Sequence, residues 1–207
     1  MAKADHSIDP RILESARQEF LKLGFEKASL KTICEKAQVT TGALYKRYKG
    51  KEELFCAVVA DTVADLNEVL QVKSSVKLDA LPDEELIRAW DMDEGYMNWW
   101  FQYLYDRHDG FVLLLTCAEG TCYSHFQHDW VEKMTESTYA YYREAYRRGL
   151  SAVNISQEEM HILLTAFWAT IYEPFIHGYN WEQLQEHCRL VCRMFDWHGV
   201  LGFSPVK

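Results

Sequence analysis

Apolar side chains recur along most of this chain at the spacing of one face of an α-helix. In residues 9–23, for example, Ile12, Ala16 and Phe20 fall four positions apart, which places them on the same side of a helix. No segment shows the sustained alternation of apolar and polar residues that is typical of a half-buried strand. The pattern therefore predicts an all-α protein, and the low content of glycine (10) and proline (4) in 207 residues fits a chain that is mostly ordered.

Helix-stopping and helix-capping residues divide this pattern into segments. Gly24 ends the first helix, because glycine readily takes a positive φ. Ser156 and Asn180 are suited to cap helix starts, whereas Pro174 kinks or closes a helix. The expected helices span about residues 9–23, 29–37, 41–48, 51–72, 83–104, 111–117, 121–148, 156–176 and 180–197, with a polar loop at 73–83.

The second and third of these helices meet the demands of a helix-turn-helix motif, in which two short helices are joined by a turn of three or four residues. Cys34 and Ala37 are small, so a following helix can cross over them, and Val39 offers an apolar plug for the turn. Leu44 faces inward from the third helix. The alternative is a small helical hairpin with no role in binding nucleic acid.

Side chains around this motif fall into two groups by the part of DNA that they suit. Short side chains at the start of the third helix fit a major groove that just admits a helix. Phenol hydroxyls and ammonium groups suit phosphate oxygens, which fix position rather than sequence, and the start of the fourth helix adds backbone amides. The predicted base-reading residues are Thr40, Thr41, Gly42 and Ala43, and the predicted anchoring residues are Thr32, Tyr45, Lys46, Tyr48, Lys49 and Lys51.

Charge is distributed unevenly between the beginning of the chain and the rest. Residues 1–50 carry ten Lys/Arg and six Asp/Glu, a balance of +4, whereas residues 51–207 carry twelve and twenty-five, a balance of −13, within the net charge of −9. A basic head on an acidic body fits a small nucleic-acid module joined to another function. Chance can also produce such a balance in a short segment. The charge is therefore supporting evidence for DNA binding, and the helix-turn-helix pattern is the main evidence.

The stretch from Thr32 to Leu54 resembles the tetracycline-repressor (TetR) family. It contains a threonine in the second helix, a turn ending in valine, small residues, leucine, tyrosine, a further aromatic residue and a lysine–glutamate pair, in the family's order and spacing. With the preceding helix, the resemblance covers roughly residues 10–56. Three positions depart from the family pattern, namely Gln38 in place of glycine, Gly50 in place of a capping serine and Cys34 in place of alanine.

Of these departures, Gln38 has the clearest physical consequence. The family's turn tends to need a left-handed backbone at this position, where a non-glycine residue costs on the order of 1 kcal/mol. We therefore expect the turn to be strained or differently shaped.

The resemblance implies a division of labour along the chain. It predicts a three-helix helix-turn-helix DNA-binding domain in residues 1–50, linked through helix 51–72 to a helical ligand-sensing and dimerisation domain in residues 51–207. Such a protein is a homodimer that binds a palindromic operator, and we expect a repressor that a small-molecule effector releases. The resemblance implies no cofactor.

Aromatic residues are concentrated in the later part of the chain. Of 29 aromatic residues, 24 lie at or after Trp90, and six fall within residues 96–105. Six aromatic side chains in ten helical positions cannot all point one way, so they are either buried on several sides as ordinary core or line a pocket for a flat or cationic molecule. The pocket candidates are Tyr96, Trp99, Trp100, Tyr103, Glu119, Phe126, Trp130 and Phe167.

Other chemistries receive weaker support. His125 and His128 share a helical face, as metal ligands can, but the local sequence fixes no third ligand, so we predict no metal site. A cysteine–histidine enzyme would need a recognisable nucleophile context, which is absent. A further alternative is a ligand-binding or scaffold protein without DNA binding, for which Gln38 is the support.

Segments that direct a chain to a membrane are not apparent. Residues 1–10 lack the apolar core of a signal peptide, and no stretch approaches the roughly 20 apolar residues of a membrane span. The six cysteines are scattered, as is usual for reduced, packed thiols. We expect a cytoplasmic protein with no membrane partner.

Overall fold

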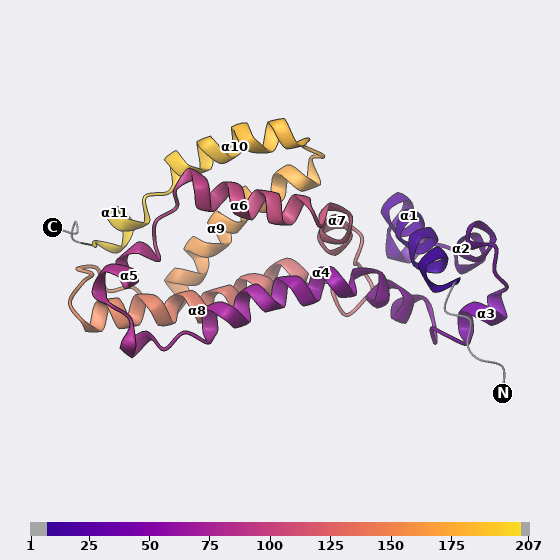
Figure 1. Ribbon diagram of the computed structural model, residues 1–207, viewed down its shortest axis with the longest axis horizontal. Coiled ribbons are helices and arrows are strands. Elements are labelled where there is room, and N and C mark those ends of the chain that lie inside the picture. Colours follow the sequence, from indigo (N-terminus) through magenta and orange to yellow (C-terminus); the bar gives the residue numbers. More distant parts are fainter. Residues whose placement is uncertain (1–7, 204–207) are drawn as a thin grey trace. The chain divides into compact units, whose positions relative to one another are not determined.

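The computed structural model describes residues 8–203, and these form helices joined by turns, with one isolated β-bridge between Ser151 and Phe203 (Figure 1). The predicted all-α class is confirmed. The elements are α1 (Asp9–Lys27), α2 (Leu30–Ala37), α3 (Thr41–Tyr45), α4 (Lys51–Ser74), the 3-10 helix η2 (Leu78–Ala80), α5 (Asp83–Arg88), α6 (Glu94–Tyr105), α7 (His108–Thr116), α8 (Phe126–Arg147), α9 (Gln157–Ile176), α10 (Trp181–Met194) and α11 (Trp197–Leu201).

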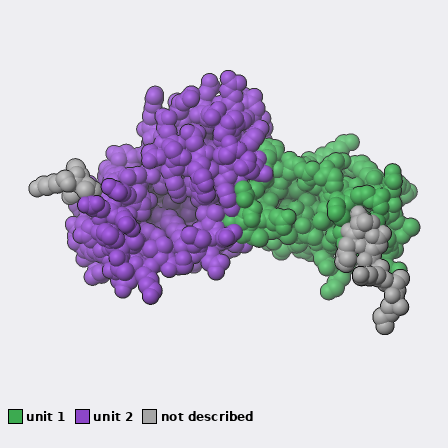
Figure 2. All heavy atoms as spheres, in the orientation of Figure 1, with its two compact units in different colours: residues 1–66, 107–126 green, residues 67–106, 127–207 purple. Residues whose placement is uncertain are grey.

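The chain forms two compact units, shown in different colours in Figure 2. Unit 1 comprises residues 1–66 and 107–126, and unit 2 comprises residues 67–106 and 127–207. The long helix α4 contributes residues to both. The functional boundary that we placed at residue 50 remains a prediction.

The core of unit 1 is built from the apolar face of α1. Ile12, Ala16 and Phe20 are completely buried, as their helical spacing predicts. Phe20 meets Phe55 of α4 edge to face, with ring centroids 5.1 Å apart. Gly110 of α7 packs closely against α4, where a Cβ atom would overlap the Thr62 side chain. Helix α2 packs against α1, and α3 packs against α2.

The predicted break at Gly24 is present. Its φ of 73° takes the backbone out of the helical conformation, and a further short turn runs on to Lys27 before α1 ends. Pro174 lies inside α9, and the helix ends two residues later at Ile176.

Several predicted boundaries are wrong, because local hydrogen bonds and burial outweigh periodicity. The single helix expected over 83–104 is interrupted between α5 and α6, where Trp90 is buried against Trp197 and Phe203. Asp93 then caps α6 by accepting a hydrogen bond from the Tyr96 amide at 2.8 Å. Other differences are that α3 ends at 45 rather than 48, α8 begins at 126 rather than 121, η2 lies within the expected loop, and the last expected helix divides into α10 and α11.

Helix caps at α9 and α10 follow the sequence. The Ser156 hydroxyl accepts from the Glu159 amide at 3.1 Å. Asn180 and Gln183 form a reciprocal capping box at the start of α10. Within unit 2, α10 packs alongside α6 (Figure 1). Among residues 8–203, the helices fall short of the length and hydrophobicity required to cross a bilayer.

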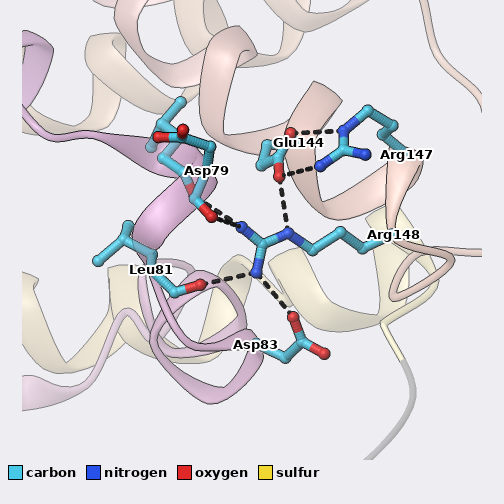
Figure 3. A network of polar contacts seen from close by, with 7 residues as sticks. Asp79, Leu81, Asp83, Glu144, Arg147 and Arg148 are labelled. Carbon is cyan, nitrogen blue, oxygen red and sulfur yellow. Dashed lines mark hydrogen bonds and ion pairs between the residues drawn. The ribbon is translucent and has the colours of Figure 1, made fainter.

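Arg148 fastens the segment before α5 to the end of α8 (Figure 3). Its guanidinium donates to the Leu81 carbonyl at 2.6 Å and to the carboxylate of Asp83 at 2.8 Å. It also donates to the carbonyls of Leu78 (2.7 Å) and Asp79 (3.1 Å) and to the Glu144 carboxylate (2.7 Å). Five acceptors on a half-buried planar group hold this linker in one arrangement.

We predict that Arg148→Ala lowers the Tm by several degrees, because it leaves the carbonyls around η2 without their donor. The matched control is Arg147→Ala, since Arg147 is largely exposed and bonds to the carboxylate of Glu144 on its own helix. That control should leave the Tm almost unchanged. Thermal unfolding followed by circular dichroism measures both, and equal effects of the two substitutions would contradict the role given to Arg148.

Candidate nucleic-acid interface and ligand cavity

The turn of the helix-turn-helix motif contains the strained residue that the sequence predicts. Gln38 lies in the left-handed region, with φ 55° and ψ 46°. Within residues 8–203 it is the single non-glycine residue with a positive φ. Its amide donates to the Glu35 carbonyl at 3.2 Å, and the Val39 amide donates to the Cys34 carbonyl at 3.0 Å. The turn thus keeps the left-handed backbone that ends α2. The Gln38 side chain makes this conformation sterically unfavourable.

We predict that Gln38→Gly raises the free energy of unfolding by about 1 kcal/mol, because glycine adopts this backbone without steric cost. Gln71→Gly is the matched control, since Gln71 is exposed within helix α4 and glycine there costs about 1 kcal/mol. Denaturant unfolding should show shifts of opposite sign. A loss of stability in Gln38→Gly would mean that the side chain makes a contact worth more than the strain.

The start of α3 presents the four predicted base-reading residues together. Thr40 caps the helix by accepting a hydrogen bond from the Ala43 amide at 3.1 Å. Thr40, Thr41 and Gly42 are exposed, Ala43 is half-buried, and Leu44 behind them is completely buried. A Cβ atom on Gly42 would meet nothing closer than the Thr40 hydroxyl oxygen at 3.9 Å. Packing within the protein therefore does not require glycine here, whereas close approach of a partner would.

The predicted anchoring residues differ in how free their polar groups are. Tyr45, Lys46 and Lys49 lie at or near the surface, whereas Thr32 and Tyr48 are half-buried. Burial raises the pKa of the Tyr48 hydroxyl, so it stays a neutral donor.

The side chain of Lys51 has a structural task that the sequence did not reveal. Its ammonium donates to the carbonyls of Glu26 (2.8 Å) and Ala28 (3.2 Å), and it lies 4.7 Å from the ring centroid of Phe25. At the same helix start, Glu53 accepts from the Lys49 amide at 2.8 Å. The Lys51 side chain is thus engaged in closing the end of α1.

Arg47 holds α3 in place and was missed by sequence reasoning. It forms an ion pair with Asp9 of α1, and its guanidinium donates to the Ala43 carbonyl at 3.2 Å. The Asp9 carboxylate therefore links α1 to the turn that follows α3, and no side chain caps the start of α1. An arginine two residues after a short helix gave no recognisable signal for this contact.

Unit 2 contains a cavity of about 600 Å³, within the range of small-molecule sites. It is lined by residues of α4, of the end of α5, of α6, α8, α9 and α11, and of the segment between α5 and α6. Five of the predicted pocket residues line it, namely Tyr96, Trp99, Trp100, Trp130 and Phe167.

The other three candidates do not line this cavity. Tyr103 stacks on Trp99, with ring centroids 5.1 Å apart. Glu119 is exposed in the turn after α7, and Phe126 is buried at the start of α8, both in unit 1. Sequence distance from the aromatic segment could not show that these two residues fall in a different compact unit.

Two comparisons bear on the N-terminal part of the chain. A family model described as bacterial regulatory proteins of the tetR family matches residues 12–58. Residues 12–58 belong to the TetR family. Over 49 residues the chain is 41% identical to the HTH-type transcriptional regulator UidR of Escherichia coli K12, an alignment that covers 24% of this chain and 25% of that relative. The resemblance predicted from the sequence is confirmed, and the aligned part spans only a quarter of the relative's length.

Solved structures extend the likeness to the fold of nearly the whole chain. The TetR-family transcriptional regulator PfmR of Thermus thermophilus aligns with a TM-score of 0.62 at 17% identity, covering 95% of this chain and 100% of that one. FadR of Bacillus subtilis, solved in complex with stearoyl-CoA, aligns with a TM-score of 0.58 at 11% identity, covering 90% and 96%. At such identities the likeness shows a shared TetR-type fold.

In this TetR-type fold, the cavity contains a charged group that sequence reasoning assigned to a loop. Helix α4 continues to Ser74, so Lys73 shares a face with Leu66, Val69 and Leu70. The helical spacing from Leu66 was the signal that could have found it. Trp90, Trp168, Trp197, Thr138 and Tyr141 also line the cavity and were not predicted.

Among residues 8–203, the Lys73 ammonium has two neutral partners. Its ammonium donates to the Thr138 hydroxyl at 2.9 Å and lies 5.6 Å from the ring centroid of Tyr141. No carboxylate among residues 8–203 is within ion-pair distance of it. Burial lowers the pKa of Lys73 to about 8 and raises the pKa of Tyr141, since both charged forms are disfavoured there.

We predict that Lys73→Met stabilises the protein at pH 7 by roughly 1–2 kcal/mol, because it removes a poorly solvated charge. Between pH 8 and 10.5 the folded lysine is neutral while the unfolded one is still protonated, so wild-type stability rises with pH and the advantage of the variant shrinks. Denaturant unfolding at several pH values measures the difference, with exposed Lys77→Met as the control. A variant that is less stable at every pH would show that Lys73 contributes packing instead.

The described part of the chain contains no cluster of side chains that could form a metal site. Within residues 8–203, no three His, Cys, Asp or Glu side chains are grouped as a metal would require. His128 lies near His161 of α9, with ring centroids 5.7 Å apart. The Thr135 hydroxyl lies 3.2 Å from His161 Nδ1, within hydrogen-bond distance, so one ring nitrogen of His161 already has a partner in the protein.

Proposed function

We propose that this chain is a homodimeric, sequence-specific DNA-binding transcription regulator in the cytoplasm, a repressor that a small molecule releases. One observation carries the proposal, namely the TetR-family segment in which α3 presents Thr40, Thr41 and Gly42 over the buried Leu44. A helix start with short accessible side chains fits a major groove, and Lys46 and Lys49 suit the flanking phosphates.

Two-fold symmetry would place two copies of α3 on a palindromic site. Exposed apolar side chains on α9 and α10 support self-association, because monomers seldom leave several large ones uncovered on two helices. Ile162 is 60% exposed, Leu190 63% and Met194 67%. We propose that α9 and α10 form the dimer interface.

The cavity in unit 2 supports the sensing half of the proposal. It has the volume of a small-molecule site and an aromatic lining. The neighbouring FadR structure is described as a complex with stearoyl-CoA, so a protein of this fold takes an organic ligand. A ligand releases DNA only if it binds one conformational state more tightly than the other.

An enzymatic function that uses a cysteine nucleophile is the rival from another class. Burial raises the pKa of Cys188 to about 12 and that of Cys56 to about 11, so these thiols remain protonated at neutral pH. A catalytic thiol needs the opposite shift. These shifts argue against Cys56 and Cys188 as nucleophiles.

Lys49→Ala tests the phosphate contact. On a duplex selected from a random pool by the wild-type protein, we expect weaker binding by several-fold on all sequences and a salt slope shallower by about one ion per protomer. Lys77→Ala, which removes an exposed lysine of unit 2, is the control. Fluorescence anisotropy against salt concentration measures both, and an unchanged slope in Lys49→Ala would remove Lys49 from the interface.

Leu190→Glu tests the dimer interface. Placing a charge in the proposed α9–α10 contact should convert the dimer to a monomer with an unaltered helical spectrum. Val200→Glu, at a 46% exposed apolar position on α11, should leave the assembly unchanged. Sedimentation equilibrium decides between these results, and a Leu190→Glu protein that remains dimeric would place the interface elsewhere.

A further inference from the structure

The cavity in unit 2 has a charge preference that its aromatic lining alone would not suggest. Four charged side chains line it, namely Lys73, Arg88, Asp91 and Asp93. Both carboxylates are already engaged. The Asp91 carboxylate lies 2.7 Å from His198 Nε2, and the Asp93 carboxylate accepts a hydrogen bond from the Tyr96 amide at the start of α6.

Lys73 is a half-buried cation of the lining that has no carboxylate partner among residues 8–203. Its partners Thr138 and Tyr141 are neutral, and Arg88, the other cation of the lining, is exposed. A partly buried charge without a counter-ion costs free energy, because it loses part of its hydration and gains no ionic partner. A ligand that carries the missing negative charge would offset that cost.

Two buried tryptophans add to the apolar part of the lining. Trp90 and Trp197 are each 3% exposed, and their ring centroids are 6.1 Å apart. Their indole nitrogens are inaccessible to water and have no hydrogen-bond acceptor among residues 8–203, so these two residues offer the cavity ring surface and no polar atom. The charge preference of the cavity therefore depends on Lys73.

We propose that the cavity binds an organic oxyanion, a carboxylate or sulfonate attached to a flat apolar body, with the anionic group on Lys73. The aromatic rings of Trp99, Trp100 and Trp130 cover the apolar body. This identifies the class of effector and rests on the proposed ligand-sensing function. It narrows the expectation of a flat or cationic molecule to a flat anionic one.

A pair of probes with one skeleton tests the charge preference. 8-Anilino-1-naphthalenesulfonate carries a sulfonate, and N-phenyl-1-naphthylamine is the same skeleton without it. We expect the full-length wild-type protein to bind the sulfonate at least tenfold more tightly, measured by probe fluorescence excited through the tryptophans. Lys73→Met should weaken sulfonate binding at least tenfold and leave the neutral probe unchanged.

Two controls keep the result interpretable. Lys77→Met removes an exposed lysine that does not line the cavity and should bind both probes as wild type does. Near-ultraviolet circular dichroism establishes that Lys73→Met keeps its packed tryptophans. Lys73→Arg, which retains the charge, should keep the preference for the sulfonate.

Three results would overturn the proposal. They are equal affinity of wild type for the two probes, equal weakening of both probes by Lys73→Met, and binding of neither probe. The measurement uses no DNA, so a protein that binds its operator and shows no sulfonate preference refutes the ligand class alone. A sulfonate preference without operator binding refutes the proposed regulator and leaves the anion site.

Discussion

One uninterrupted helix supports both halves of the proposed function. α4 runs for 24 residues from Lys51 to Ser74 with no glycine or proline, so its backbone hydrogen bonds continue unbroken through the interior. Near its start, Leu54 and Phe55 are completely buried in the core that carries the helix-turn-helix motif. In its last turn, Lys73 lines the cavity. A ligand bound at Lys73 would therefore contact the same helix that packs in the core of the helix-turn-helix motif. One continuous helix thus connects the two proposed sites.

The motif was predictable because its determinants are local. The left-handed turn falls at Gln38, where the sequence predicts it, and Ser29 and Thr40 cap the helices that follow them. Each of these features depends on residues within a few positions, where spacing and side-chain chemistry decide the outcome. The length of α3 was overestimated, since the turn of residues 46–48 depends on how Arg47 pairs with Asp9.

The cavity was only half predictable because it depends on contacts far apart in sequence. Trp90 interrupts an expected helix to pack against Trp197, more than a hundred residues later. Glu119 and Phe126 looked close to the aromatic segment and belong to unit 1. Periodicity shows that side chains such as Trp99 and Trp100 need several neighbours, but it does not say which helices supply them. Lys73 was concealed by a loop assignment that ended α4 two residues early.

Both sites contain a residue that we expect to cost stability, Gln38 in the turn and Lys73 in the cavity, and such departures from local rules are typical of functional positions. The most direct test of the central claim is a hydroxyl-radical footprint of the wild-type protein on the DNA upstream of its own coding sequence. We predict two protected patches related by a dyad and centred about one helical turn, or a small multiple of it, apart. A stable dimer that protects no site there, or protects DNA uniformly without dyad symmetry, would contradict sequence-specific recognition through α3.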